Sequence, residues 1–458
     1  RTLIADGSGN VSTEHEYQLI GLVPGMRNYI TLKLYNRKDQ LSKSIVYAVD
    51  IPKSATQAKT RISTCDGRSR QEISNGLYTV FGNGRTTAQK SVKIVTKKVT
   101  KNGKKVTKRV KKTVTKKVRK NVIAMYDNSG VLRSEMPLEA NVAKNMQIIY
   151  DNIVYPCSAN KFTRINDLGQ VTRIYQVNGY KQDGEFAYDG YGNIYFIASA
   201  LGKKTSRNSR IMSLELETGK VSLALDFDNF LSEMYKKSGK KANWIDINSV
   251  QVCGTNKLII SSKSLSSIFK VSNVGSLLPK LDYIIADKDI WAKCKNLKKK
   301  VLKKYSKDDA DESATADPSA TDDTDSIESI LNQGKKKPDP FRSQYGQNAL
   351  TSNSSGTLIT MLNNNAGKYA KKSNDKSYYY QFKVNESAKN YRVSEKKAFE
   401  KTSNNGNIIK GDSRYIYCCS DKGKFIETDS AGKLIKGFKT GGRPYRVYKN
   451  DWKNFWFY

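Results

Sequence analysis

The chain has 458 residues, of which 38% are hydrophobic and 10% aromatic. This composition excludes a generally disordered chain, and the length allows two or three domains, or one repeat array with an appendage and a sizeable core. With 80 Lys or Arg against 43 Asp or Glu, the formal charge is +37, which implies an anionic partner. Candidate partners are a cell-wall polymer, a sulfated or sialylated glycan, an acidic protein segment and nucleic acid.

The cysteines and the single histidine exclude several kinds of site. The six cysteines include no Cys-x-x-Cys pair and no Cys/His cluster, so we predict neither a metal site nor a cofactor. The only histidine is His15, which we expect to be structural. Ser-His-Asp and Cys-His mechanisms need a catalytic histidine, and no histidine other than His15 could supply one. No run of about 20 apolar residues occurs, and we predict no membrane span.

Residues 1–62 are predicted to form a small N-terminal β domain, similar to a β-sandwich. The stretches YQLIGLVPGMRNYITLKLYN and SIVYAVDI have the composition of short strands, and Pro24-Gly25 predicts a tight turn.

The segment of residues 90–120 is predicted to be a projecting β-hairpin arm. It contains 15 Lys or Arg and no acid, with Val and Thr interleaved, and Asn102-Gly103 at its centre is a strong hairpin signal. Charged residues also protect an exposed strand edge from aggregation, so a solvated edge remains the alternative. The candidate assembly residues of the arm are Lys97, Lys98, Asn102, Gly103, Lys104, Lys105 and Arg109.

From residue 122 onward, apolar strands and Gly-bearing turns recur in units of about 40 to 50 residues, which is typical of a β-propeller. We therefore predict an all-β fold with a propeller over residues 63–458. Within it, the stretch from Trp244 to Lys270 holds alternating apolar runs and predicts a meander of short antiparallel strands.

Residues 293–340 interrupt the repeats. A basic stretch, KCKNLKKKVLKKYSK, is predicted to be helical, and a flexible acidic loop follows it. The loop does not match the calcium-binding loop pattern, so calcium binding is not favoured. The loop either contacts the basic arm or is a solvated spacer. Its candidate residues for contact with the basic arm are Asp308, Asp309, Asp311, Glu312, Asp322, Asp323 and Asp325.

Several motifs resemble those of the arylsulfate sulfotransferases that use no nucleotide sulfate donor. The stretch WIDINSVQ, the later LIISSKSLSSIFKV, the N-terminal Gly-Leu-x-Pro-Gly pattern and the NGLYTVFG stretch are all similar to that family. The resemblance implies a six-bladed propeller after a small β domain, sulfuryl transfer between phenols through a sulfo-histidine, and export from the cell.

The resemblance also implies where the site residues should lie. The family's histidines correspond to Gly184, Asp246 and Asn348, and its arginine corresponds to Lys263. Because an amide cannot form a labile sulfuryl adduct, we predict no catalytic residue. The positions of the degenerate site are Gly184, Glu185, Asp246, Asn248, Lys263, Asn348, Asn363, Asn364 and Asn365.

These observations favour a non-catalytic, exported structural, assembly or adhesive protein that binds anionic partners. The arm predicts a homo-oligomer or filament, and anionic surface polymers or glycans are possible partners. Three alternatives stay open: an active sulfotransferase with altered site chemistry, a nucleic-acid-binding protein, and a hydrolase that uses Glu185 and Asp246 as a carboxylate pair. Nucleic acid is disfavoured because no stacking aromatics or recognition helix accompany the basic segment.

Overall fold

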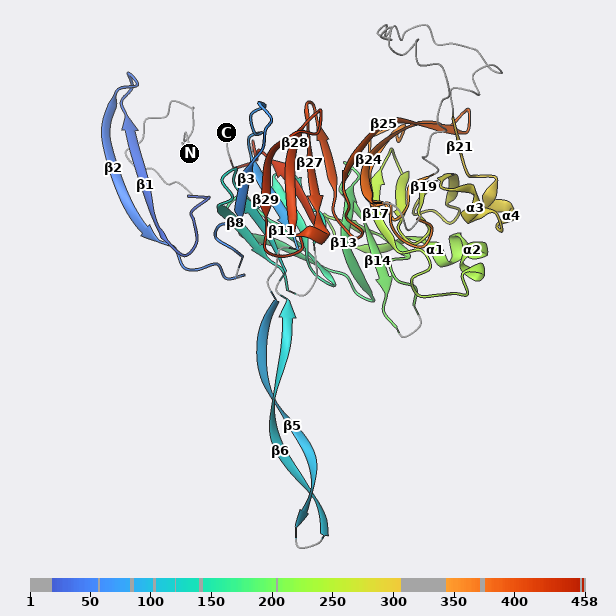
Figure 1. The fold of residues 1–458 in the computed structure, drawn as a ribbon, viewed down its shortest axis with the longest axis horizontal. Coiled ribbons are helices and arrows are strands. Elements are labelled where there is room, and N and C mark those ends of the chain that lie inside the picture. The colour runs from blue at the N-terminus through green and yellow to red at the C-terminus, as the bar shows by residue number, and fades with distance from the viewer. Residues whose placement is uncertain are drawn as a thin grey trace. The chain divides into compact units, whose positions relative to one another are not determined.

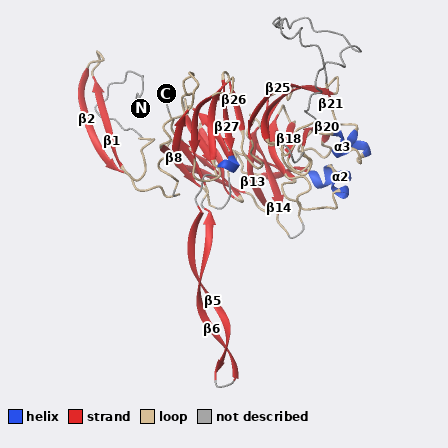
Figure 2. Cartoon of the chain, in the orientation of Figure 1, coloured by secondary structure: helices blue, strands red, loops and turns tan. Residues whose placement is uncertain are grey.

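The computed structural model describes residues 19–56, 58–82, 86–101, 104–119, 121–139, 143–202, 205–305, 343–370, 375–453 and 455–456. Strands dominate these residues, and the few helices are short (Figure 2). The predicted all-β class is confirmed. His15, Asn102, Gly103 and the acidic candidates between Asp308 and Asp325 lie outside the described residues.

Within this part of the chain, six sheets of four or five strands are the blades of a six-bladed β-propeller. Figure 1 labels many of their strands. Blade 1 contains β30 (Arg446–Asn450), β4 (Leu77–Phe81), β7 (Val122–Tyr126) and β8 (Leu132–Pro137). Blade 2 contains β9 (Gln147–Ile149), β10 (Asn152–Ser158), β11 (Lys161–Ile165) and β12 (Val171–Gln176). Blade 3 contains β13 (Tyr180–Tyr188), β14 (Asn193–Ala200), β15 (Arg210–Glu215) and β16 (Val221–Asp226).

The other three blades follow in the same way. Blade 4 contains β17 (Ile247–Val252), β18 (Leu258–Ser262), β19 (Ser267–Ser272) and β20 (Lys280–Ile285). Blade 5 contains β22 (Asn348–Ser352), β23 (Leu358–Asn363), β24 (Lys376–Asn385), β25 (Asn390–Glu400) and β21 (Lys303–Lys304). Blade 6 contains β26 (Ile408–Gly411), β27 (Arg414–Cys419), β28 (Lys424–Asp429), β29 (Leu434–Lys439) and β3 (Ser63–Asp66).

The chain divides into two compact units, residues 1–184 with 405–458 and residues 185–404. In the first unit, strands distant in sequence share sheets. Strand β3 pairs with β29 through Thr64 opposite Phe438, and β30 pairs with β4 through Val447 opposite Val80. Both ends of the blade-forming region are thus held by backbone pairing, which closes blades 1 and 6.

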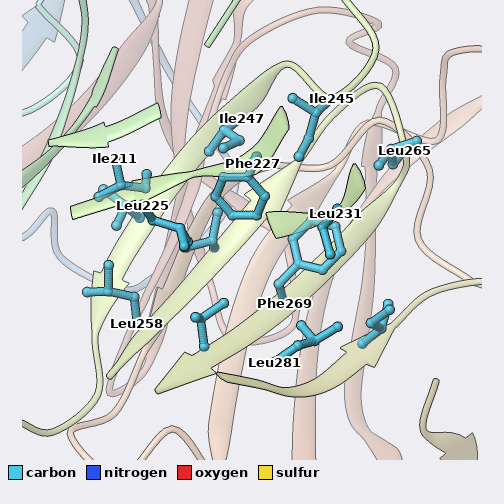
Figure 3. Packing of buried hydrophobic residues seen from close by; sticks show 14 of the residues in the cluster. Ile211, Leu225, Phe227, Leu231, Ile245, Ile247, Leu258, Leu265, Phe269 and Leu281 are labelled. Atoms are coloured by element: carbon cyan, nitrogen blue, oxygen red, sulfur yellow. The ribbon is translucent and has the colours of Figure 1, made fainter. Parts of the chain in front are cut away.

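The second unit is built around a large apolar core. Its strands are rich in β-branched and aromatic residues, which fit a pleated and buried surface. Figure 3 shows Ile211 of β15, Ile247 of β17 and Phe269 of β19 converging on one cluster. The predicted meander after Trp244 is present as β17, β18 and β19.

Short helices in two loops of this unit add to the core, and sequence reasoning missed three of the four. They are α1 (Phe227–Phe230), α2 (Ser232–Lys237), α3 (Lys288–Trp291) and α4 (Lys295–Lys298). The Asp226 and Asp287 side chains cap the first turns of α1 and α3, which satisfies otherwise unpaired backbone donors. Phe227 and Trp291 are buried in the core.

The basic stretch before the acidic loop is less helical than predicted. Its described residues form only the single turn of α4 and the two-residue strand β21, whose Lys303 and Lys304 pair in parallel with Asn390 and Tyr391 of β25. Like-charged lysines along one helix face repel one another, which disfavours a longer helix.

Two further two-stranded sheets stand outside the blades. Strands β1 (Arg27–Tyr35) and β2 (Leu41–Asp50) pair antiparallel, and the described residues before Ser63 supply no second sheet to complete a sandwich. Strands β5 (Thr86–Lys101) and β6 (Lys104–Arg119) pair antiparallel with each other, as the sequence predicted for residues 90–120.

Candidate functional site

Asp246 and Lys263, two of the predicted site positions, are neighbours through the backbone. The amide nitrogen of Lys263 donates to the carbonyl oxygen of Asp246 at 3.1 Å. Asp246 has a φ of +44°, and its carboxylate accepts from the Asn208 amide at 3.0 Å. The Lys263 Nζ atom donates to the Asn404 side chain at 3.0 Å, near the surface.

Asn248 and Asn348 are also brought together, in the interior. Asn248 is 4% exposed, and its side-chain amide nitrogen donates to the Gln347 carbonyl at 2.7 Å and to the Asn348 Oδ1 atom at 3.4 Å. Gln347 donates in turn to the Ser261 hydroxyl at 3.0 Å and to the Ser267 carbonyl at 3.1 Å. These amides therefore join blade 4 to the start of blade 5.

The asparagine run at the end of β23 serves the local backbone. The Asn363 Oδ1 atom accepts from the backbone nitrogens of Tyr345 and Asn365, each at 2.9 Å. The Asn364 amide donates to the Thr402 carbonyl at 2.9 Å. The Asn365 carbonyl accepts from the Lys401 Nζ atom at 2.6 Å, so the run contacts a different set of groups from Asn248.

Gly184 and Glu185 lie at the boundary of the two units, inside β13. Gly184 has a φ of +95°, a conformation that favours glycine, and its carbonyl accepts from the backbone nitrogen of Lys144 at 2.9 Å. The Lys144 Nζ atom forms an ion pair with Asp183, and both side chains are largely buried. Glu185 is 2% exposed.

The side chains at these positions are amides, carboxylates and one lysine, which bind through hydrogen bonds and charge. Among the described residues, no three His, Cys, Asp or Glu side chains lie where they could together hold a metal ion. In the same part of the chain, no helix is long and apolar enough to cross a membrane.

A buried charge cluster in the first unit was missed by the sequence analysis. Glu427 of β28 has no exposed side-chain surface and accepts from Tyr78 at 2.5 Å, Arg414 at 2.7 Å and Lys449 at 3.1 Å. The Lys449 Nζ atom also lies 4.0 Å from the centre of the Tyr78 ring. The cluster thus links blade 6, through β27 and β28, to blade 1, through β4 and β30.

A local signal for this cluster exists in the sequence. Glu427 follows Phe425 by two residues, so the two side chains share one face of β28, and Phe425 is fully buried. An acid at an inward position of a strand predicts a buried partner of opposite charge.

The surroundings shift the pKa values of the cluster. Burial alone would raise the pKa of Glu427, but the Tyr78 hydroxyl, the Lys449 charge, the Ser74 amide and Arg414 together outweigh burial and lower it to about 2. Burial lowers the pKa of Lys449 to about 8, because attraction to Glu427 compensates only in part and Arg414 adds to the lowering.

The basic hairpin presents charge along its whole length. It contains 14 Lys or Arg and no acid between Thr86 and Arg119, and its register runs without a bulge from Thr86 opposite Arg119 to Lys101 opposite Lys104. Lys93, Lys97 and Arg109 are exposed, as are Val92 and Ile94. The side chains of Lys98, Lys104 and Lys105 lie outside what the structure describes.

Solved structures similar to this chain match at low identity. A protein of unknown function from Bacteroides caccae is 10% identical with a TM-score of 0.40, over 82% of this chain and 98% of that one. The periplasmic gluconolactonase of Pseudomonas aeruginosa is 9% identical with a TM-score of 0.37, over 72% and 94% of the two chains. No curated protein sequence matches significantly.

The comparison with protein families gives a definite result. The model of the arylsulfotransferase (ASST) family matches residues 66–436, which is more than half of the chain. That range begins in β3 and ends in β29, so it includes strands of all six blades and the positions from Gly184 to Asn365. This chain therefore belongs to the arylsulfotransferase family.

Proposed function

We propose that this protein is a non-catalytic member of its family that acts as an exported structural or adhesive module and assembles through its basic hairpin. The observation that carries the proposal is the type of the residues that the family resemblance matches to the family's histidines, which are Gly184, Asp246 and Asn348. A sulfo-histidine mechanism needs a neutral imidazole as nucleophile, and none of these residues supplies one.

The hydrogen bonds of the same region support this proposal. The donors of Asn248 and Asn364 are directed to the carbonyls of Gln347 and Thr402. The acceptor of Asn363 is used by two backbone nitrogens. Polar groups used in this way hold adjacent strands together, as buried polar groups of a structural core do.

The charge of the chain supports binding to an anionic partner. The formal charge of +37 is the surplus that remains after the 43 Asp or Glu are set against the 80 Lys or Arg, and the hairpin concentrates 14 cations in 34 residues without an acid. A neighbouring copy could supply the acidic segment between Asp308 and Glu328, and an anionic surface polymer or glycan could supply more charge.

Sulfuryl transfer from a chromogenic aryl sulfate to a phenol tests the absence of catalysis. We expect release of the phenol no faster than with heat-denatured protein. The same rate is measured for the variant Asn348→His, prepared in the same way, which places an imidazole at one of the family's histidine positions. Turnover by the natural chain above the denatured control would instead support an active enzyme with altered chemistry.

A further inference from the structure

The cross-strand pairs of the basic hairpin repeat in a four-residue pattern. The register sets Lys93 opposite Lys112 and Val95 opposite Val110. The same register then sets Lys97 opposite Lys108, Val99 opposite Val106, and Lys101 opposite Lys104. Because side chains alternate between the two faces of a strand, residues separated by two or four positions belong to the same face. We call the cross-strand pairs that belong to one face a phase of the hairpin. From Lys93 to Lys101 on β5, lysine pairs and valine pairs therefore alternate in one phase, whereas the pairs before Lys93 in that phase are mixed.

The other phase of the hairpin is different. There no two cations face each other: most pairs join one cation to one uncharged residue, as in Ile94 opposite Lys111 and Thr96 opposite Arg109, and Val92 opposite Thr113 contains no cation. Like charges directly opposite each other destabilise an antiparallel pair, whereas a cation beside threonine or isoleucine does not. The repulsion between facing lysines is thus confined to one phase, at every fourth residue.

Both strands of the hairpin are edge strands. In the described residues β5 and β6 form a sheet of two, so each has one row of backbone groups that no other strand pairs with. A two-stranded sheet alone is marginally stable in water. A second copy of the hairpin is a poor third strand, because in any register it adds only positive charge and has no acid to place beside a lysine pair.

We propose that the hairpin accepts, as a third strand, an extended acidic polypeptide in which an acid recurs at every fourth residue with an apolar residue midway between. Such a strand places each acid beside a lysine pair and each apolar side chain beside a valine pair. Its backbone N–H and C=O groups form hydrogen bonds with those along one open edge of the hairpin. Strand addition of this kind is a general mode of peptide recognition. The lysine pairs admit this partner and exclude the identical hairpin of another copy.

Two features favour a polypeptide over other polyanions. The hairpin contains no Phe, Tyr or Trp between Thr86 and Arg119, so it offers no surface on which nucleobases could stack. It exposes Val92 at 63% and Ile94 at 69%, as well as the open backbone edges, and a strand can contact all of these. A polysaccharide or a nucleic acid would use the charges alone.

This inference rests on the proposed assembly function, since it specifies the chemistry of what the hairpin binds. The test uses the intact chain and two labelled peptides of equal composition, Glu-Thr-Val-Thr-Glu-Thr-Val-Thr-Glu and Glu-Thr-Val-Glu-Thr-Val-Glu-Thr-Thr. In the first, the acids share one face of a strand. In the second, a spacing of three distributes them over both faces.

We expect the first peptide to bind about tenfold more tightly in fluorescence anisotropy at about 0.15 M salt, because three favourable cross-strand positions add up. Methylating its central backbone nitrogens, which keeps the charge and removes the donors, should abolish binding. Equal affinity of the two peptides, or unchanged binding after methylation, would show a mere polyelectrolyte surface and overturn the inference. Equally strong binding of duplex DNA of the same charge would overturn it too.

Matched variants of the chain assign the effect to one phase of the hairpin. Lys93→Gln with Lys112→Gln removes one lysine pair, and Arg109→Gln with Lys111→Gln removes the same charge from the other phase. The first variant should reduce the preference for the first peptide, and the second should weaken both peptides equally. Equal effects of the two variants would contradict the assignment. The proposed assembly function fails on a different result, namely unchanged self-association after removal of the hairpin.

Discussion

Glu427 shows how a single residue can hold two blades together. The exposed fraction of its side chain is zero, and it is the shared acceptor of Tyr78, Arg414 and Lys449. We expect Glu427→Gln to lower the free energy of unfolding by about 3 kcal/mol, because the buried Lys449 and the partly buried Arg414 would lose their counter-charge. Denaturant unfolding of the variant measures this. Glu72→Gln, an exposed position beside the cluster, should change stability by less than about 0.5 kcal/mol, and equal effects would contradict the role of Glu427.

The same carboxylate makes stability depend on pH. Its pKa is about 2 in the folded chain against an ordinary value of 4.5, so its contribution is fully present above pH 4.5 and is lost as the pH falls toward 2. We expect the natural chain and Glu427→Gln to differ most in urea midpoint near pH 6 and to converge below pH 3. A difference that stays constant over this range would show that the charge of Glu427 contributes nothing.

A variant of Asn248 tests the proposal that the predicted site positions have a structural role. Its amide donates to the buried carbonyl of Gln347 at 2.7 Å. Asn248→Ala should therefore cost about 1–3 kcal/mol, since the carbonyl would lose a buried donor. The matched variant is Asn404→Ala, which removes only an exposed acceptor of Lys263 and should have almost no effect. Similar melting temperatures of the two variants would contradict a structural role for Asn248.

The hairpin of β5 and β6 lies in the chain between β4 and β7, two strands of blade 1 that pair directly with each other. Phe81 of β4 lies opposite Ile123 of β7, and the Gly82 nitrogen donates to the Val122 carbonyl at 3.2 Å. Replacing residues 83–120 by Asn-Gly would leave a three-residue loop, Asn-Gly-Asn121, between Gly82 and Val122, and loops of this length are common in hairpins. We expect this variant to fold with an unchanged melting temperature within a few degrees. Loss of the cooperative thermal transition would show that the hairpin contributes to the blade.

Individual elements were predictable where the signal is local. Asn102-Gly103 between two basic, β-branched runs predicted the strands that the structure places at β5 and β6. The runs after Trp244 likewise predicted β17 to β19. Helix α1 was missed because its start depends on Asp226, the last residue of a strand, and its stability depends on burial of Phe227.

At the scale of the whole molecule, the sequence pattern could not show how blades 1 and 6 close. Strand β3 pairs with β29, which is more than 360 residues later in the chain, and no local pattern encodes a contact at that separation. The same limit applies to the cluster of Tyr78 with Glu427, which are separated by 349 residues. The site positions came from family motifs, because their residue types alone identify no chemistry.

The proposed assembly has to overcome the charge of the whole chain. At +37, copies repel one another, so we propose that the acidic segment of one copy meets the basic hairpin of the next, and a contact of that kind that does not close on itself would propagate into a filament. We expect sedimentation velocity to show concentration-dependent association of the intact chain at low salt. The association should weaken as salt rises past about 0.1 M, where the screening length falls to about 10 Å. The variant with residues 83–120 replaced by Asn-Gly is expected to sediment as a monomer under all these conditions. An intact chain that stays monomeric at low salt and high concentration, or a variant that associates as the intact chain does, would contradict assembly through the hairpin.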